Sequence, residues 1–139
     1  MNEKLVMYTD GAARGNPGPA AIGVVLKNEA GVTAATICRA LGRATNNQAE
    51  YTAVVEGLEK AISLGAKQVV LKSDSELVVK QLMGLYKVKN ADLREMYQKV
   101  IKLTSQLEKF SAMNIPREQN KQADALCNKA LDEGEGRRV

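Results

Sequence analysis

KLVMYTDGAARGNPGPAAIGVVLK, residues 4–27, is the stretch of sequence that decides the fold. Its first part, residues 4–9, has the apolar character of a buried strand and ends at Asp10. The segment Gly11–Pro19 is rich in glycine and proline, which favour a loop or a tight turn. An apolar pattern resumes at residues 20–27, which are therefore predicted to form a second strand.

Further along the chain, the apolar periodicity changes from strand-like to helical and back. A turn at 28–31 and a third strand at 32–40 complete an antiparallel meander. Thr45 and Gln48 form a capping box that starts a helix, and Gly65 ends it. The later elements are expected as strand, helix, helix, strand and helix at 68–72, 75–83, 90–107, 109–115 and 120–132. This order predicts an α/β fold, in which a mixed five-stranded sheet, antiparallel and then parallel, carries helices on both faces.

Length and composition indicate one domain with a substantial core. The chain has 139 residues, 45% of them hydrophobic and 26% charged, so residues 1–139 are expected to form a single domain. Residues 133–139 are expected to be a flexible tail. No apolar run approaches the roughly 20 residues that span a bilayer, and Met1–Leu5 does not resemble a secretory signal. A monomeric, cytoplasmic protein that makes no membrane contact is therefore expected.

Charge and the lack of histidine narrow the chemistry that the chain can perform. The formal net charge of +4 and the pI of about 9.1 favour polyanionic partners. Because the sequence contains no histidine, every mechanism that uses imidazole as base, nucleophile or metal ligand is excluded. Cys38 and Cys127 are far apart and show no metal or redox spacing, so two buried thiols are expected, with a disulfide left open. Catalysis would have to use carboxylates, hydroxyls, lysine or a metal.

Certain carboxylates stand where solvated acidic residues are unusual. Asp10 and Asp74 end apolar strands, and ligands of open α/β sheets bind at the carboxyl ends of strands. Glu50 and Asp124 each follow an alanine early in a predicted helix. Carboxylates that cluster repel one another, and Mg²⁺ or Mn²⁺ relieves the repulsion. Taken singly, Asp74 is equally well read as a helix cap, Asp124 as a helix-dipole partner and Asp10 as a turn former.

Short segments spread along the chain together carry a family resemblance. They are Tyr8–Gly11 with Gly15–Pro19, then Thr45–Glu50, then Ser73–Ser75, and last Arg117 with Asn120 and Ala123–Asp124. In this order and at these intervals, the chain resembles a type 1 ribonuclease H over about residues 4–132. It is most similar to the shorter subgroup that lacks a basic protrusion. The resemblance implies the ribonuclease H-like fold, whose mixed five-stranded sheet agrees with the pattern-based prediction.

The resemblance also implies an activity and its catalytic residues. Metal binding and catalysis would rest on Asp10, Glu50, Asp74 and Asp124. In the family mechanism, two Mg²⁺ ions, for which Mn²⁺ can substitute, straddle the scissile phosphate, with Asp10 as the bridging ligand. One ion activates the attacking water and the other stabilises the leaving 3′ oxygen. The implied reaction is hydrolysis of the RNA strand of RNA–DNA hybrids to 5′-phosphate and 3′-hydroxyl products.

A set of substrate-binding residues follows from the same resemblance. Asn16 and the pair Asn46 and Asn47 match positions that face the minor groove, where the 2′-hydroxyl distinguishes RNA from DNA. Amide side chains suit that contact because they both donate and accept hydrogen bonds. Arg43 and Thr45 match positions near a phosphate of the DNA strand. The predicted substrate-binding residues are Gly11, Asn16, Arg43, Thr45, Asn46, Asn47 and Ser75.

Three features depart from the family pattern. Many members carry a histidine in the loop before the last catalytic aspartate, but Arg117–Lys121 has none, and Arg117 or Glu118 is a candidate replacement. Leu85–Asn90 stands where other members insert a basic protrusion, so weaker hybrid binding is expected. Glu76 stands where several members have glutamine, which adds a negative charge near the predicted site.

Other functions remain compatible with these carboxylates. One is a weakly active or inactive nucleic-acid-binding module on the same fold, against which the complete carboxylate set argues. Another is a different phosphoryl-transfer enzyme, such as a transposase or junction resolvase core, against which Asn46 and Asn47 argue. Double-stranded RNA remains open as a second substrate, because both duplexes are A-like.

Overall fold

The computed structural model describes residues 2–136. Within them, five strands and four α-helices follow one another in the predicted order, with one additional 3-10 helix, η1. The elements are β1 (Lys4–Ala13), β2 (Gly18–Lys27), β3 (Thr33–Ala44), α1 (Asn46–Ser63), β4 (Gln68–Ser73), α2 (Glu76–Leu82), α3 (Ala91–Thr104), β5 (Lys109–Asn114), η1 (Arg117–Gln119) and α4 (Lys121–Gly136).

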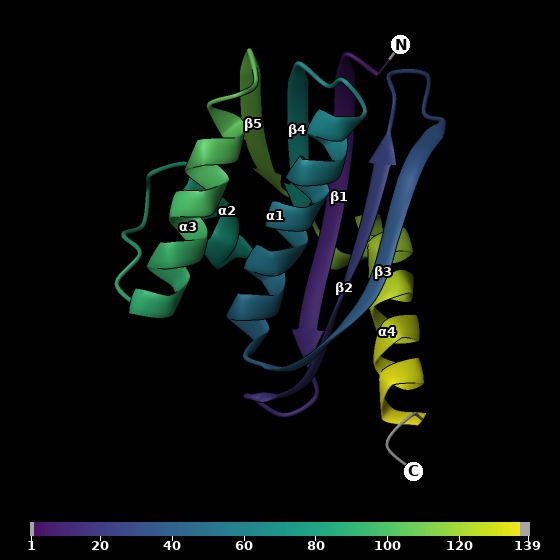
Figure 1. Cartoon of the computed structure of the whole chain (residues 1–139), viewed down its shortest axis with the longest axis vertical. Coiled ribbons are helices and arrows are strands. Elements are labelled where there is room, and N and C mark those ends of the chain that lie inside the picture. Colours follow the sequence, from purple (N-terminus) through teal and green to yellow (C-terminus); the bar gives the residue numbers. More distant parts are fainter. Residues whose placement is uncertain (1, 137–139) are drawn as a thin grey trace.

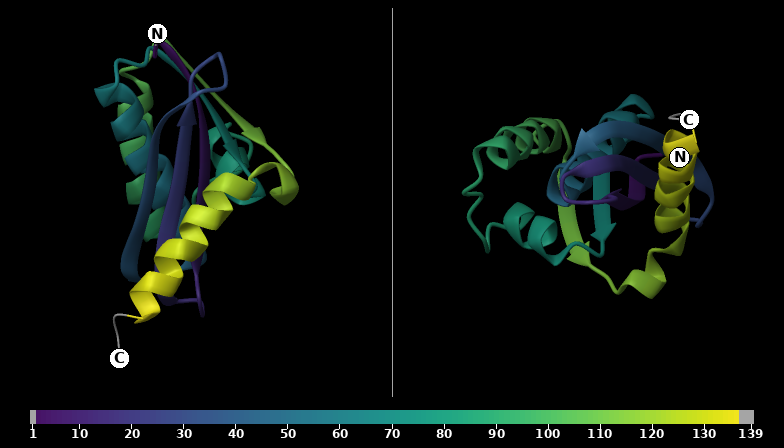
Figure 2. Two further views of the ribbon diagram at one scale, coloured as in Figure 1. Left: turned by 90° about the vertical axis from the view of Figure 1, so that its right-hand side faces the viewer. Right: turned by 90° about the horizontal axis from the view of Figure 1, so that it is seen from below.

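The strands form one mixed sheet in the order β3-β2-β1-β4-β5. β2 is antiparallel to both β1 and β3, whereas β4 is parallel to both β1 and β5. Helices α1 and α3 lie on one face of the sheet, and α4 runs diagonally across the other (Figures 1 and 2). The predicted α/β fold class, with its antiparallel and parallel halves, is therefore confirmed. No helix within residues 2–136 is both long and apolar enough to cross a bilayer.

The strands that flank the glycine-rich segment are longer than predicted. β1 does not end at Asp10 but continues to Ala13, because its antiparallel pairing with β2 extends to Ala13 and Ala20. The predicted loop Gly11–Pro19 is thus reduced to residues 14–17. Only the parallel pairing of β1 with β4 stops near Asp10, and its last pair is Thr9 with Ser73. Asp10 therefore stands where β1 loses one of its two neighbours.

The C-terminal part of the chain also differs from the prediction. α4 continues beyond the expected end at Asp132 and reaches Gly136. Residues 137–139 lie outside the described residues, so the flexibility of the tail stays a prediction. The 3-10 helix η1 was not predicted, because a single turn leaves no periodic pattern in the sequence.

The close approach of two helices to the sheet positions the site. A Cβ atom added at Gly11 would overlap the backbone of Ala49 in α1, and one added at Gly23 would overlap the backbone of Ala123 in α4. Glycine at these two strand positions lets the first turns of both helices touch the sheet. Glu50 and Asp124, which directly follow Ala49 and Ala123, are thereby placed near Asp10.

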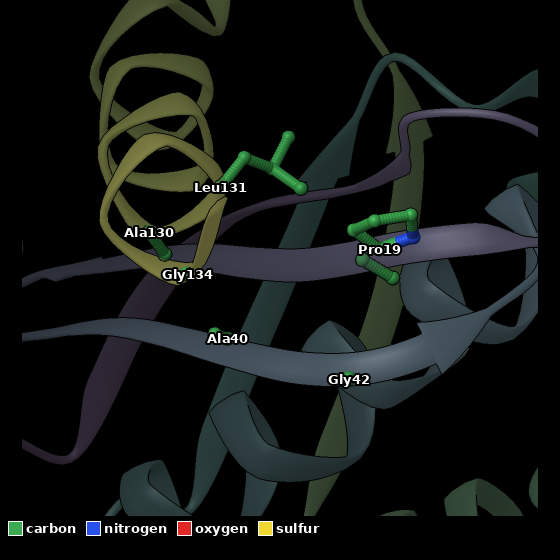
Figure 3. Close-up of a pocket in the computed structure, with 7 residues that line it drawn as sticks. Pro19, Ala40, Gly42, Ala130, Leu131 and Gly134 are labelled. Carbon is green, nitrogen blue, oxygen red and sulfur yellow. The ribbon is translucent and has the colours of Figure 1, made fainter. Parts of the chain in front are cut away.

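The core is divided by the sheet into a large and a small part. The large part lies under α1 and α3 and contains Leu5, Met7, Ile22, Val24, Leu26, Tyr51, Leu58, Leu71 and Val100, all fully buried. The small part lies under α4 and contains Ala21, Cys127, Ala130 and Leu131. A hollow of about 220 Å³ remains between the last turns of α4 and strands β2 and β3, lined by Pro19, Ala20, Ala40, Gly42, Ala130, Leu131 and Gly134 (Figure 3). None of the predicted site residues lines it.

Candidate active site

Three of the predicted carboxylates come together at one end of the sheet. Oxygen atoms of Asp10, Glu50 and Asp74 lie within 4.8 Å of one another. Parallel pairing places Thr9 beside Ser73, so the two aspartates that follow them emerge from adjacent strands. Glu50 reaches the same place from α1, where its side chain accepts a hydrogen bond from the Gly11 N–H. The structure thus clusters these three carboxylates, and their role in metal binding stays a prediction.

Asp124 lies beside this group rather than within it. Its position in the first turn of α4 is as predicted, and its carboxyl is close enough to Asp10 to raise the pKa of that residue. All four carboxylates line one open hollow of about 610 Å³. The remaining residues that line it are Gly11, Ala12, Asn46, Asn47, Ser75, Glu76, Asn114, Ile115, Pro116, Arg117 and Asn128.

The helix caps leave Asp74 free for another role. The Ser75 hydroxyl, not Asp74, caps α2 by accepting a hydrogen bond from the Val78 N–H at 3.3 Å. Interpreting Asp74 as a helix cap is therefore wrong. At α1 the predicted capping box is present, with Thr45 Oγ1 3.1 Å from Gln48 N and Gln48 Oε1 2.9 Å from Thr45 N.

Burial and mutual repulsion make these carboxyl groups hard to ionise. Burial, followed by the neighbouring Asp74 and Asp124, raises the pKa of Asp10 from 3.8 to about 7. Burial and then Asp10 raise the pKa of Glu50 well above 4.5, although the Gly11 N–H opposes the shift. Burial also raises the pKa of Asp74, and the Arg117 guanidinium acts in the opposite direction. A set of hard oxygen ligands whose negative charges lack compensation fits a divalent cation.

Two asparagines of the predicted substrate set, Asn16 and Asn46, are oriented by hydrogen bonds from the backbone. Asn46 Oδ1 accepts a hydrogen bond from the Ala13 N–H at 2.7 Å, and Asn16 Oδ1 accepts one from the Asn46 N–H at 3.1 Å. Both carbonyl oxygens are thus occupied by backbone donors. The NH₂ groups of Asn16 and Asn46 are consequently the ends available to a ligand.

The predicted substrate-binding residues divide between two adjoining hollows. Those that line the carboxylate hollow are Gly11, Asn46, Asn47 and Ser75. Asn16 and Thr45 line a second hollow of about 250 Å³, and Asn47 borders both. Arg43 is exposed on β3 and lines neither hollow. The structure therefore gathers most of the set along one surface but leaves Arg43 apart.

Arg117, which the sequence offered both as part of the family resemblance and as a candidate replacement for the missing histidine, lies at the site. Its guanidinium Nη2 lies 3.4 Å from Oδ1 of Asp124, and its side chain lines the carboxylate hollow. Glu118 is exposed and does not line the hollow. Of the two candidate replacements for the missing histidine, Arg117 alone lies at the site.

Two asparagines at the site were missed by the sequence reasoning. Asn114 Nδ2 donates to the carbonyl of Ser73 at 3.1 Å, and Asn128 Nδ2 lies 3.4 Å from Oδ2 of Asp124. Asn114 ends the strand that pairs with β4, so its place at the predicted sheet edge was a usable signal. Asn128 lies one helical turn after Asp124, which was a second such signal.

Comparison with known proteins agrees with the fold. A family model described as "Reverse transcriptase-like" matches residues 8–130. A Halobacterium salinarum protein named ribonuclease HI is 45% identical over 126 residues, which is 91% of this chain and 63% of the relative. The crystal structure of ribonuclease H1 from the same archaeon has a TM-score of 0.91 at 44% identity and covers 94% of this chain and 98% of that one.

A further solved relative is LC11 ribonuclease H1, crystallised in complex with an RNA/DNA hybrid. It has a TM-score of 0.88 at 42% identity, and the match covers 93% of this chain and 97% of that one. The chain spans 63% of the length of the archaeal curated relative and 36% of the length of mycobacterial relatives that are 43% identical. Because the family match covers most of the chain and whole ribonuclease H domains superpose on it, this chain belongs to the ribonuclease H family.

Proposed function

We propose that this chain is a divalent-metal-dependent endoribonuclease that hydrolyses the RNA strand of RNA–DNA hybrids to 5′-phosphate and 3′-hydroxyl products. The observation that carries the proposal is the convergence of Asp10, Glu50 and Asp74, with oxygens within 4.8 Å of one another, in an open hollow. A hollow of this size and openness admits a polymer backbone. That LC11 ribonuclease H1 has been crystallised with an RNA/DNA hybrid supports the substrate class.

The ligand set favours Mg²⁺, with Mn²⁺ as an alternative, because every available donor is a hard oxygen. The ions would be held by Asp10, Glu50, Asp74 and Asp124. When bound, such ions supply an activated water and neutralise the charge that develops on the leaving oxygen. Asp10 has the central place, since burial and both neighbouring aspartates act on its carboxyl.

Residues around the carboxylates fix their positions and charges. The Gly11 N–H holds one oxygen of Glu50, which sets the direction of that side chain. Arg117, 3.4 Å from Asp124, supplies a positive charge that opposes protonation of Asp74. Arg117 thereby offsets part of the effect of burial on the pKa of Asp74.

Recognition of RNA would rest on the oriented asparagines. Because the side-chain oxygens of Asn16 and Asn46 accept hydrogen bonds from backbone N–H groups, their NH₂ groups are the donors that face the substrate. The 2′-hydroxyl oxygen and the minor-groove base edges accept hydrogen bonds from such donors. A DNA strand offers no 2′-hydroxyl, so the preference for RNA follows.

The test uses a hybrid with each strand labelled in turn, incubated with Mg²⁺, with Mn²⁺ and with EDTA. Parallel reactions contain single-stranded RNA, double-stranded RNA and duplex DNA. Asp10→Asn is the inactivating variant, and Glu59→Gln, which changes an exposed acid on α1, is the matched control. Metal-dependent cutting of the hybrid's RNA strand by the wild type and the control, but not by Asp10→Asn, is the expected result. An intact hybrid with both metals, from folded protein, would refute the catalytic proposal in favour of a binding module.

A further inference from the structure

Asn120 joins the elements that carry two of the carboxylates. It lies between η1 and α4 and is 1% exposed. Its side-chain Nδ2 donates to the carbonyl of Thr9 at 2.8 Å, on the residue directly before Asp10. Its own backbone carbonyl accepts a hydrogen bond from the N–H of Asp124 at 3.1 Å. A single residue thus ties the end of the β1–β4 pairing to the first turn of α4.

The same side chain acts on the third aspartate. Burial raises the pKa of Asp74, and the Asn120 amide is among the groups that lower it. The geometric link to Asp74 runs through Thr9. Thr9, whose carbonyl accepts the Asn120 hydrogen bond, is the last β1 partner of Ser73, the residue directly before Asp74.

This arrangement is maintained despite an energetic penalty. Among the described residues, Asn120 Oδ1 is a buried side-chain oxygen without a hydrogen-bond partner. An unsatisfied buried acceptor destabilises the folded state. Rotating the amide by half a turn would not satisfy Oδ1. It would place Oδ1 against the carbonyl oxygen of Thr9, and two acceptors cannot form a hydrogen bond. Leucine has nearly the same shape and would avoid the penalty, so packing alone does not account for asparagine here.

A parallel contact occurs on the neighbouring strand. Asn114 Nδ2 donates to the carbonyl of Ser73, the residue directly before Asp74, at 3.1 Å. Asp10 and Asp74 are thus each preceded by a residue whose carbonyl accepts a hydrogen bond from an asparagine amide. Asn120 differs in being buried and in also contacting the helix that carries Asp124.

We infer that Asn120 is a positioning residue that sets the spacing of Asp10, Asp74 and Asp124 for metal binding. The inference rests on the proposed function, in which these carboxylates hold the divalent ions. Residues that orient metal ligands without touching the metal typically contribute about 10- to 100-fold to metal affinity. Loss of the Asn120 amide should therefore weaken metal binding even when the fold survives.

The experiment compares Asn120→Ala and Asn120→Leu with the wild type. Asn120→Leu keeps the side-chain volume, so it serves where the alanine variant fails to fold. Val100→Ala is the control, because it removes buried methyl groups from α3 and lowers stability without touching the site. Calorimetric titration with Mn²⁺ in the absence of substrate gives metal affinity. Hybrid cleavage then gives the Mg²⁺ concentration for half-maximal rate and, separately, the KM for the hybrid.

Both Asn120 variants are expected to bind Mn²⁺ at least about tenfold more weakly and to need correspondingly more Mg²⁺, with an unchanged KM for the hybrid. Val100→Ala should lower the melting temperature and leave metal affinity unchanged. Wild-type metal affinity in folded Asn120 variants would overturn the inference and leave a purely structural role. A wild type that neither binds metal nor cuts hybrid would overturn the proposed function, and the inference with it.

Discussion

Replacing Asp10 by asparagine should stabilise the metal-free protein at neutral pH while abolishing cleavage. Burial and the neighbouring Asp74 and Asp124 raise the pKa of Asp10 from 3.8 to about 7. Each pKa unit corresponds to about 1.4 kcal/mol, so ionising this carboxyl in the folded protein costs up to about 4 kcal/mol. The full amount is not regained in the variant. Part of the repulsion also acts among the neighbouring acids, and the asparagine amide is itself a polar group that must be buried. A net gain of about 1–3 kcal/mol is therefore expected.

The effect has a definite pH dependence. Because the pKa of Asp10 is higher in the folded than in the unfolded chain, the folded state favours the protonated form. The contribution of Asp10 to the free energy of unfolding is therefore fully present below pH 3.8 and is lost as the pH rises to about 7. Asp10→Asn does not titrate at this position. The difference in the free energy of unfolding between variant and wild type should therefore be small near pH 4.5 and reach its full size above pH 7.

Thermal unfolding in EDTA at pH 4.5 and pH 8 measures this difference. For a chain of this length, 1 kcal/mol shifts the melting temperature by about 3–5 °C, so Asp10→Asn should melt about 3–15 °C above the wild type at pH 8. Glu59→Gln, the exposed control, should change little. Added Mg²⁺ should raise the wild-type melting temperature and narrow the gap, since the ion binds only the folded carboxylates. A variant that melts below the wild type at pH 8, or by the same margin at both pH values, would refute the reasoning.

Three further predictions concern packing, recognition and thiol reactivity. Gly11→Ala should destabilise the protein by about 1–3 kcal/mol or more, because the new methyl group overlaps the α1 backbone; an unchanged urea midpoint would contradict this. Asn46→Ala should raise the KM for the hybrid about tenfold through loss of one hydrogen bond, which steady-state kinetics would show, and an unaltered KM would exclude the contact. Burial raises the pKa of Cys127 to about 12, so iodoacetamide at pH 8 should label the exposed Cys38 first; equal labelling by mass spectrometry would count against the buried position.

Local sequence signals predicted the elements better than their ends. The capping box of Thr45 and Gln48 is a contact between residues three apart, and it is present as expected. The end of β1 was misjudged because Gly11 and the residues after it look like loop, whereas pairing with β2 holds them in the sheet through Ala13. Cross-strand pairing is a tertiary effect that composition does not encode. Cys38 was also misjudged, because it was expected to be buried and is exposed on the edge strand β3.

The residues of the candidate site differ in how far the sequence alone could place them. Asp10 and Asp74 could be placed together from the sequence, because each follows an apolar run and the parallel pairing of β1 with β4 stops directly before them. Arg43 entered through family resemblance, and the structure leaves it outside both hollows. The contacts of Asn120 could not be read from the sequence, because its side chain bonds to Thr9, 111 residues away. Only the folded chain brings these two residues together.

The diagonal docking of α4 has a consequence for how the protein is made. The backbone of α4 touches β2 at Gly23, and its first turn delivers Asp124 to strands near the other end of the chain. During synthesis, a ribosome-bound chain still missing α4 would already display β1, β2 and β3, but with an incomplete set of carboxylates. Contacts of such long sequence separation form late in folding. The carboxylate set should therefore be completed abruptly, when α4 docks on the sheet, rather than grow with chain length.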